Sequence, residues 1–334
     1  MEKYIYYFVL IFACSFSQEK NEIFAMFYNV ENLFDTIDDK SKNDNEFLPN
    51  SKKEWNSEKY FHKLDQLEKV FSSINNKKIP NIIGLCEVEN KLVIDDLLKQ
   101  PFFKNHSFQI LHQESPDNRG IDCAILFDAK FELIKSDFIE IKIPESSRPT
   151  RDIVYVELKV NNTESLHLFV NHWPSRWGGT EKTEHKRIYT ANVLKKYIEK
   201  NIGKNGNILL MGDFNDYPSN KSMTENLEKT KKVKFTNLMS FLEGKNNGSY
   251  NYKGEWGFLD HIIISSNLLE KSGCRKIANK LKVTKYGVFK EDWMLHEGKK
   301  PNRTYGGLNK KTGLYNWYGG FSDHLPIYCV IKFL

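Results

Sequence analysis

The sequence has few of the features that would divide it into domains or hold it in a membrane. Its 334 residues include only 10 prolines and 19 glycines, and they contain no Pro/Gly/Ser-rich linker, long run of like charge or internal repeat. Hydrophobic residues make up 40% of the chain and charged residues 28%, a balance typical of one soluble core. We therefore predict a single domain over residues 23–334, with no stable membrane span.

Cysteine and the familiar nucleophile motifs are also scarce. The 5 cysteines are an odd number, and their spacing matches neither a zinc site nor a dense disulfide framework. Cys86, Cys123 and Cys329 lie in apolar, strand-like runs and are predicted to be small buried hydrophobes, whereas Cys274 lies in a polar stretch. No GxSxG, HExxH or GxxxxGK[ST] pattern is present, so no serine hydrolase, zinc protease or P-loop reading competes with the site described below.

The N-terminus differs from the rest of the chain. The apolar run at residues 4–13 is too short to span a bilayer but fits the core of a signal peptide. Small residues at Ser15 and Ser17 suit signal peptidase, so residues 1–17 are predicted to be a signal peptide and the protein to be exported, either secreted or periplasmic. Two alternatives remain. Acylation of Cys14 would give an outer-surface lipoprotein, and the run could instead form a buried first strand.

The body of the chain alternates short β-like runs with helical ones. A helix that Ser57 could cap shows apolar residues at helical spacing as far as residue 74. Further helices are predicted at 91–99 and 184–202. Strands are predicted at 23–30, 81–87, 108–112, 122–127, 153–160, 166–171, 207–211, 258–265 and 325–333.

The strand patterns indicate two sheets rather than one. Some runs, such as 81–87, are apolar throughout and suit strands covered on both faces, while others alternate. One helix-covered parallel sheet does not accommodate both kinds. We predict an α/β fold, a four-layer sandwich of two packed mixed or antiparallel sheets flanked by helices.

Polar groups gather at the ends of the predicted strands. Each of them alone has an ordinary explanation, such as a turn residue or a solvated charge. As a set of carboxylates, imidazoles and amides they describe a site for a hard cation with an acid/base partner. The residues are Asn29, Glu87, His172, Asp213, Asn215, Asp260, Asp323 and His324.

The segments that carry these residues resemble a known superfamily. In chain order they read NVEN, EVEN, RGIDCAIL, NHWPSR, GDFND, LDHI and SDHLP. This series is similar to the endonuclease/exonuclease/phosphatase superfamily, with the deoxyribonuclease-I-like fold, and most closely to its extracellular-nuclease-like bacterial branch. The resemblance runs from about Ile23 to the C-terminus, and GDFND together with SDHLP is its most specific part.

The resemblance implies a metal centre and a water nucleophile. Glu87 is expected to be the principal ligand of Mg²⁺ or Mn²⁺, with Asn29 and Asp323 beside it as ligands or as residues that hold it. Asp213 is expected to orient or deprotonate the attacking water, and Asn215 to hold a phosphate oxygen.

The resemblance also implies two imidazoles at the phosphate. His324 is expected to contact the scissile phosphate, with Asp260 fixing its tautomer and raising its basicity. His172 is expected to stabilise the developing charge or to protonate the leaving oxygen. Asp122 is a further candidate, although the preceding residues also read as a plain turn.

Basic and aromatic residues near these motifs are candidates for substrate contact. Arg176 and Arg119 are predicted to bind substrate phosphate through their planar guanidinium groups. The other candidate arginines are Arg148, Arg151 and Arg303, and the tryptophans that could stack on bases are Trp173, Trp177 and Trp317.

The predicted function is an exported, divalent-metal-dependent phosphoesterase. A nuclease that hydrolyses phosphodiester bonds by in-line attack of water is the first reading, and a monomer is expected. The formal charge of +6 suits nucleic acid or another phosphate ester as the substrate. The alternatives are a phosphatase or a lipid phosphodiesterase of the inositol phosphate or sphingomyelin type, and a non-catalytic surface-binding protein.

Overall fold

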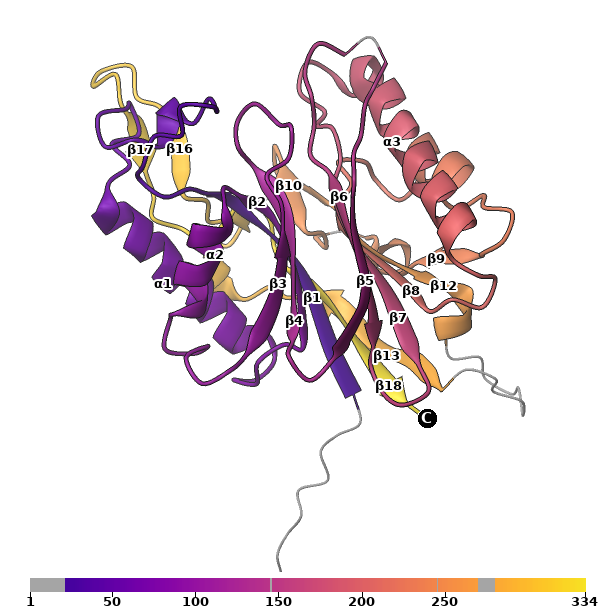
Figure 1. Cartoon of the computed structure of the whole chain (residues 1–334). Helices are drawn as coiled ribbons and strands as arrows, with labels where there is room; N and C mark the ends of the chain where they lie inside the picture. The colour runs from indigo at the N-terminus through magenta and orange to yellow at the C-terminus, as the bar shows by residue number, and fades with distance from the viewer. Residues whose placement is uncertain (1–21, 145, 245, 270–279) are drawn as a thin grey trace, which may run out of the picture.

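Two six-stranded sheets lie face to face in the structure, a computed structural model that describes residues 22–144, 146–244, 246–269 and 280–334 (Figure 1). The predicted signal peptide, Cys14 and Cys274 lie outside these residues. The first sheet has the order β13-β18-β1-β2-β4-β3. Its strands are β1 (Glu22–Leu33), β2 (Ile82–Val88), β3 (Phe108–His112), β4 (Asp122–Asp128), β13 (Leu281–Val288) and β18 (Ile327–Phe333).

The second sheet has the order β5-β6-β7-β8-β12-β9. Most neighbouring strands in both sheets are antiparallel, but β1 runs parallel to β2 and β7 runs parallel to β8. The strands of the second sheet are β5 (Glu132–Ile139), β6 (Ile153–Lys159), β7 (Ser165–His172), β8 (Ile208–Asp213), β9 (Phe235–Asn237) and β12 (Asp260–Ser265).

Helices cover the outer faces of the two sheets. In Figure 1, α1 (Ser57–Ile74) and α2 (Lys91–Leu98) lie outside the first sheet, and α3 (Thr180–Asn201) lies outside the second. Buried apolar side chains form one cluster between the sheets and one beneath the helices on each side. The predicted four-layer sandwich is therefore confirmed.

The first strand illustrates how the apolar runs encode these layers. Successive side chains of a strand point to opposite faces. On β1, Phe27 packs in the cluster between the sheets, whereas its neighbours Met26 and Tyr28 pack in the cluster beneath α1. Both faces of β1 are thus covered, which is why the run is apolar throughout. A close approach of the two sheets also requires Gly84 on β2, because a Cβ there would lie 2.7 Å from a methyl carbon of Val170 on β7.

The remaining elements are short and lie in the connections. The strands are β10 (Tyr250–Tyr252), β11 (Glu255–Gly257), β14 (Leu295–His296), β15 (Lys300–Pro301), β16 (Tyr305–Leu308) and β17 (Tyr315–Trp317). The short helices are η1 (Asn45–Phe47), the π-helix η2 (Ser222–Leu227), η3 (Leu238–Leu242), η4 (Ser266–Leu268) and η5 (Asp292–Met294). No helix in the described ranges is long and apolar enough to cross a membrane.

Every strand and helix predicted from the sequence is present, with differences at the ends. The N-cap of α1 is Asn56 rather than Ser57, because the Asn56 side chain accepts a hydrogen bond from the backbone amide of Lys59. Helix α3 begins at Thr180, four residues before the predicted start. The prediction missed three strands of the two main sheets: β5, whose side chains are mostly exposed, the short β9, and β13. Cys86, Cys123 and Cys329 are buried and free, as predicted.

Candidate active site

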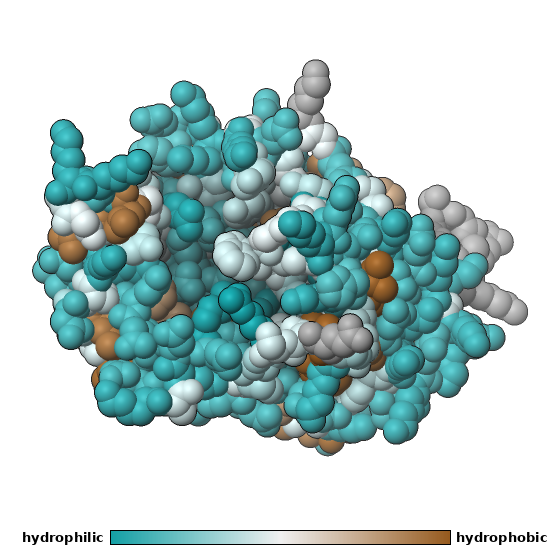
Figure 2. Space-filling model, turned by 90° about the horizontal axis from the view of Figure 1, so that it is seen from above, coloured by the Kyte–Doolittle hydropathy of each residue, from teal (hydrophilic) through white to brown (hydrophobic). Residues whose placement is uncertain are grey.

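The predicted site residues meet at one edge of the sandwich, at the top of Figure 1. Figure 2 looks onto this edge and shows it hollowed, with mostly hydrophilic surface around the hollow. The carboxyl ends of the parallel pairs β1–β2 and β7–β8 both reach this edge. Strand β1 begins and β18 ends at the opposite edge, where Glu22 pairs with Lys332 (Figure 1).

The second sheet places three site residues side by side. His172 on β7 pairs in register with Asp213 on β8, and Asp213 pairs with Asp260 on β12. This alignment depends on Gly212, because a Cβ there would lie 2.3 Å from the backbone oxygen of Asn171. The glycine of GDFND is thus required for β8 to pass close to β7 and bring Asp213 next to His172.

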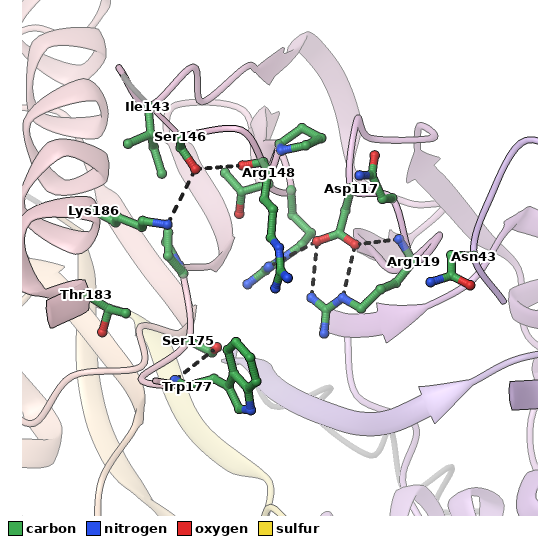
Figure 3. Close-up of a pocket in the computed structure, with 15 residues that line it drawn as sticks. Asn43, Asp117, Arg119, Ile143, Ser146, Arg148, Ser175, Trp177, Thr183 and Lys186 are labelled. Carbon is green, nitrogen blue, oxygen red and sulfur yellow. Dashed lines mark hydrogen bonds and ion pairs between the residues drawn. The ribbon is translucent and has the colours of Figure 1, made fainter. Parts of the chain in front are cut away.

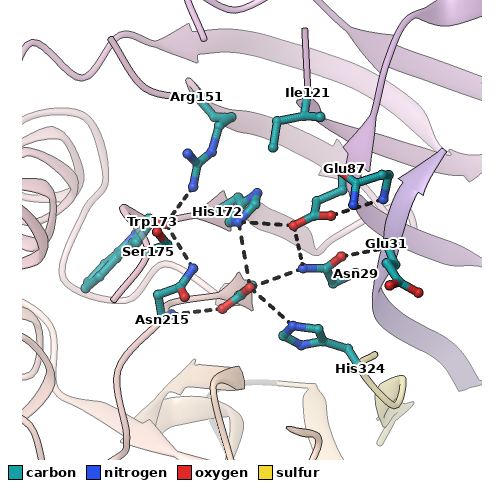
Figure 4. A network of polar contacts seen from close by, with 12 residues as sticks. Asn29, Glu31, Glu87, Ile121, Arg151, His172, Trp173, Ser175, Asn215 and His324 are labelled. Carbon is teal, nitrogen blue, oxygen red and sulfur yellow. Dashed lines mark hydrogen bonds and ion pairs between the residues drawn. The ribbon is translucent and has the colours of Figure 1, made fainter. Parts of the chain in front are cut away.

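Asp213 is at the centre of the cluster, since it lies close to Asn29, His172 and His324, which Figure 4 labels. Its Oδ2 lies 3.2 Å from Nδ2 of Asn29, 3.7 Å from Nε2 of His172 and 3.8 Å from Nε2 of His324. Its Oδ1 accepts a hydrogen bond of 2.9 Å from the backbone amide of Asn215. Burial raises the pKa of Asp213 to about 7, against the opposing effect of His324 and with a further increase from Asp260. A carboxyl group with such a pKa is suited to accept a proton near neutral pH.

His324 and Asp260 form a direct pair. Nδ1 of His324 donates to Oδ2 of Asp260 over 2.7 Å, and both side chains are buried. Burial alone would lower the pKa of His324, but Asp260 and Asp213 outweigh it and raise the pKa well above its ordinary value. His324 is therefore protonated at neutral pH, with its Nε2 directed toward Asp213. The expected pairing of these two residues is present.

His172 is in the opposite electrostatic state. Its Nε2 lies 3.8 Å from Oε1 of Glu87, and within the described residues its buried Nδ1 has no hydrogen-bond partner. Burial lowers the pKa of His172 well below its ordinary value, and Arg151 and Arg119 add to this effect. The site thus holds one neutral and one protonated imidazole, a difference the sequence does not reveal.

Glu87 offers the most accessible carboxylate of this cluster. Its Oε2 accepts a hydrogen bond of 3.0 Å from the backbone amide of Asn32, and its side chain is 17% exposed. The backbone of Glu87 has a φ of 63°, which is uncommon for a residue with a side chain and occurs frequently at functional sites. Its neighbour Asn29 donates from Nδ2 to Glu87 and to Asp213, while Oδ1 of Asn29 accepts from the amide of Glu31. Asn29 therefore joins the two carboxylates through hydrogen bonds.

The donor set fits a hard divalent cation. Glu87 presents carboxylate oxygens toward solvent, and such oxygens are the ligands that Mg²⁺ and Mn²⁺ prefer. Ligand atoms of Asp213, Asp260 and His324 also lie within 4.8 Å of one another. His324 is less suited to hold an ion because its Nδ1 is engaged by Asp260 and a protonated imidazole offers no free lone pair.

Asp323 lies in an adjoining network that sequence reasoning largely missed. Its Oδ2 is 3.3 Å from Nη2 of Arg303, and Arg303 in turn lies 3.0 Å from Oε1 of Glu31. Glu31 is buried and also accepts from the amide of Thr304. Below it, the fully buried Lys63 donates to Oγ1 of Thr304 over 2.7 Å, and burial lowers the pKa of Lys63 to about 8.

The signal for this network was present in the NVEN motif. Glu31 follows Asn29 by two residues, but as a charge next to a strand end it reads as an ordinary surface group. Lys63 lies on the apolar face of its helix and belongs to no motif. Its burial is therefore visible only when α1 is placed against the 303–321 segment. Arg303 was a candidate for phosphate contact, and the structure pairs it with Glu31 and Asp323.

The other predicted residues have distinct surroundings. Asn215 donates from Nδ2 to the backbone oxygen of Trp173 over 3.1 Å, next to Asp213. Arg119 pairs with Asp117, at 3.1 Å from both Nε and Nη2. Arg176 donates to Oδ1 of Asn220, and its guanidinium carbon lies 4.2 Å from the centre of the Tyr217 ring.

Asp122 is engaged in buried polar contacts, and two of the tryptophans pack inside the protein. Asp122 is buried, 3.2 Å from Nε2 of His112, and accepts from the amide of Ser115. Trp173 is buried, and Trp317 packs against Trp55. Trp177, in contrast, is 77% exposed.

A buried ion pair anchors the loops around the site. Nε of Arg187 on α3 lies 2.7 Å from Oδ1 of Asp216, the residue after Asn215, and both side chains are buried. Nη1 of Arg187 also donates to Oγ1 of Thr183, and Nη2 to the backbone oxygen of Thr180. The pair therefore ties the first turns of α3 to the GDFND loop. Asp216 is part of that motif, but nothing in the sequence identifies Arg187 as its partner.

Comparisons with known proteins agree with the fold and the motifs. The sequence model of the Endonuclease/Exonuclease/phosphatase family matches residues 24–332. No curated protein sequence matches the chain.

Solved structures show the same architecture at low sequence identity. D. rerio TDP2 complexed with a single-strand DNA product is 14% identical, covers 93% of this chain and 98% of its own, and has a TM-score of 0.56. The human Nocturnin catalytic domain with bound sulfate is 16% identical, with coverages of 94% and 96% and a TM-score of 0.55. A family protein from Bacteroides thetaiotaomicron is 14% identical, with coverages of 95% and 99% and a TM-score of 0.55.

Proposed function

Because the chain belongs to the endonuclease/exonuclease/phosphatase family, we propose that it is an exported phosphodiesterase that uses Mg²⁺ or Mn²⁺ to hydrolyse nucleic acid. The observation that carries this proposal is the arrangement around Asp213. A buried carboxyl with a pKa of about 7 lies between a neutral His172 and a protonated His324, beside the accessible carboxylate of Glu87. This set supplies a proton acceptor, a proton donor and a cation ligand at one point.

The residues take the following roles in the proposed reaction. Asp213 orients the attacking water and accepts its proton, and the oxygen of that water attacks phosphorus in line with the leaving oxygen. Protonated His324, held by Asp260, faces the phosphate through Nε2 and stabilises its charge. Neutral His172 hydrogen-bonds to the reacting group on the other side of Asp213, and Asn215 contacts a phosphate oxygen. A cation held by Glu87 would neutralise phosphate charge and polarise the P–O bond.

Nucleic acid is the substrate that the surroundings of the site favour. Several basic side chains border the cluster, including Arg119 and Arg151, and phosphate backbones bind to such groups. The complex of D. rerio TDP2 with a single-strand DNA product supports the same reading, as does the sulfate bound to human Nocturnin. The complete set of acidic and imidazole groups argues against a scaffold that has lost catalysis.

Export remains part of the proposal. The apolar run at residues 4–13 supports it, and the family match begins at residue 24, a few residues after the proposed cleavage. Mass spectrometry of the protein from the native envelope or medium should find residues 1–17 removed, or residues 1–13 removed with Cys14 acylated. An intact Met1 in a cytoplasmic fraction would exclude both forms.

A panel assay tests the activity. Plasmid DNA, RNA, bis-p-nitrophenyl phosphate, inositol phosphates and sphingomyelin are each incubated with the protein and Mg²⁺ or Mn²⁺. Hydrolysis of DNA or RNA is expected, with loss of activity in excess chelator and recovery when the ion is restored. Activity on sphingomyelin or inositol phosphates alone would favour the alternative phosphatase or lipid phosphodiesterase, and undiminished activity in chelator would refute the metal site.

A charge-removing variant locates the ion. Glu87→Gln preserves size and removes the charge of the proposed ligand, so it should raise the concentration of Mg²⁺ needed for half-maximal activity. Glu132→Gln is the matched control, because Glu132 is exposed on β5 and pairs with Lys159. Equal metal requirements in the two variants would show that Glu87 does not hold the ion.

A further inference from the structure

A second cavity opens beside the catalytic cluster, at the same edge of the sandwich. It has a volume of about 620 Å³, within the range of small-molecule sites. The loop before β4, the β5–β6 connection, the β7–α3 loop and the first turns of α3 form its walls (Figure 3). We call it the basic pocket and define it by Asp117, Arg119, Arg148, Arg151, Trp177 and Lys186.

The basic pocket is joined to the catalytic cluster through one backbone oxygen. Nη2 of Arg151 donates to the oxygen of Trp173 over 2.6 Å, and Nδ2 of Asn215 donates to the same oxygen over 3.1 Å. The amide of Asn215 in turn donates to Asp213. A group bound in the pocket would therefore lie next to the residues that act on the scissile phosphate (Figure 4).

The charge of the pocket suits an anion. Among its described lining residues, four basic side chains face one carboxylate. That carboxylate, Asp117, is shared between Arg119 at 3.1 Å and Arg151 at 3.2 Å, so it orients two guanidinium groups at once. Arg151 is only 5% exposed, and within the described residues its Nε lacks a hydrogen-bond partner. Because a single carboxylate is shared by these two guanidinium groups, the pocket keeps an excess of positive charge that an anion would balance.

The outer part of the pocket combines cations with an exposed indole. In Figure 3, Arg148 lies between Lys186 on α3 and the Asp117–Arg119 pair, with Trp177 below it. The guanidinium carbon of Arg148 lies 5.6 Å from the centre of the Trp177 ring. An exposed tryptophan beside cations is the arrangement on which single-stranded bases stack while their phosphates are bound.

We propose that the basic pocket binds a second phosphate of the substrate strand, adjacent to the one that is cleaved, and that Trp177 stacks on the attached base. This inference rests on the proposed phosphodiesterase function and narrows its substrate to strands with a phosphate on each side of the reacting nucleoside. The choline cation of sphingomyelin would be repelled here, whereas a phosphorylated end of DNA or RNA would bind.

Dinucleotides that differ by one phosphate test the pocket. The protein with Mg²⁺ is given TpT, 5′-phosphorylated pTpT and 3′-phosphorylated TpTp, and KM and kcat are measured for each. One of the two phosphorylated forms should have a KM about tenfold or more below that of TpT, since a charge-assisted contact contributes about that factor. In the double variant Arg148→Ala/Lys186→Ala this ratio should fall toward one.

Matched variants separate the pocket from general charge. Lys196→Ala removes an exposed lysine from the same helix, about 15 Å farther along α3, and should preserve the ratio. Trp177→Ala should weaken the binding of nucleotide substrates, which have a base to stack. It should not change any preference for an inositol bisphosphate over the monophosphate, which has no base. An unchanged ratio in the Arg148/Lys186 variant, or an equal loss with Lys196→Ala, would overturn the proposal.

A binding measurement keeps the pocket testable without turnover. Calorimetry compares thymidine 3′,5′-bisphosphate with the two thymidine monophosphates, and the bisphosphate should bind about tenfold or more tightly. If no phosphodiester is hydrolysed but the bisphosphate preference is present and disappears in the Arg148/Lys186 variant, the proposed function fails and the pocket stands. Equal affinities for the bisphosphate and monophosphates would refute the pocket itself.

Discussion

The pair formed by His324 and Asp260 allows the most demanding test of the proposed chemistry. Asp260→Asn keeps the shape of the side chain but removes the charge that lies 2.7 Å from Nδ1 of the imidazole. A hydrogen bond to a charged group contributes about 1.5–3 kcal/mol, so the pKa of His324 should fall by about one to two units in this variant. Asp213 still raises the pKa of His324 in this variant, so the protonated fraction of the imidazole should fall at a lower pH than in the parent.

Loss of the protonated imidazole should appear in turnover. His324→Ala should lower kcat by a factor on the order of a hundred or more, and Asp260→Asn by somewhat less. Because the two residues act as one unit, the double variant should be little slower than His324→Ala alone. The assay is kcat for a dinucleotide at saturating Mg²⁺, together with the imidazole pKa from NMR titration.

The same pair makes a prediction about stability. The pKa of His324 is raised in the folded state, so the stabilisation is complete below the unfolded pKa of about 6.5 and is lost as the pH rises through the folded pKa. The difference in unfolding free energy between the parent and Asp260→Asn should therefore be larger at pH 6 than at high pH. Asp65→Asn, at an exposed position on α1, is the control.

Two results would refute this reasoning. Fully additive losses in kcat would mean that His324 and Asp260 work independently, and the acid/base role would then pass to His172 and Asp213. An unchanged imidazole pKa in Asp260→Asn would show that the carboxylate does not control protonation, whatever happens to turnover.

The remaining predictions concern the metal, Asp213 and the buried ion pair. Chelation should abolish hydrolysis, and Glu87→Gln should need more Mg²⁺ than the parent; equal titrations would contradict the assignment. Activity should rise as the pH passes about 7, where Asp213 loses its proton. Asp213→Asn should abolish turnover. The same variant should nevertheless have an unfolding free energy on the order of 1–3 kcal/mol higher above pH 7, because the cost of ionising a buried carboxyl is removed. If denaturant titration at pH 8 finds the Asp213→Asn protein less stable than the parent, the predicted gain in unfolding free energy is refuted. Arg187→Met should destabilise the fold by about 2–3 kcal/mol, because buried Asp216 loses its nearest cation and keeps only Arg176 at 3.6 Å and the hydroxyl of Ser222. A loss below 1 kcal/mol would show that the pair does not anchor α3.

Much of the fold, and the set of polar residues that gather at one edge of the sandwich, were predictable from local pattern. The apolar run before Asn29 and the one before Glu87 predict strands, and the polar residue that ends each run marks the edge of a sheet. Strand β5 was not predicted because its side chains are mostly exposed, so no periodic apolar pattern marks it. Strand β13 was not predicted for a related reason, since lysine, threonine and tyrosine lie there among few apolar residues.

The order of the motifs along the chain therefore predicts the family, the layers of the sandwich and the residues that gather around Asp213. Each of these depends on short segments, and each segment has its own apolar pattern. Protonation and partnership depend instead on what the folded chain brings together. His172 and His324 are both histidines at strand ends, yet burial near Arg151 makes one neutral and contact with Asp260 makes the other a cation. Lys63 with Thr304, Arg187 with Asp216 and the basic pocket around Arg148 each join segments far apart in the sequence. Electrostatic interactions act through distance and burial, and neither exists before the sheets have packed.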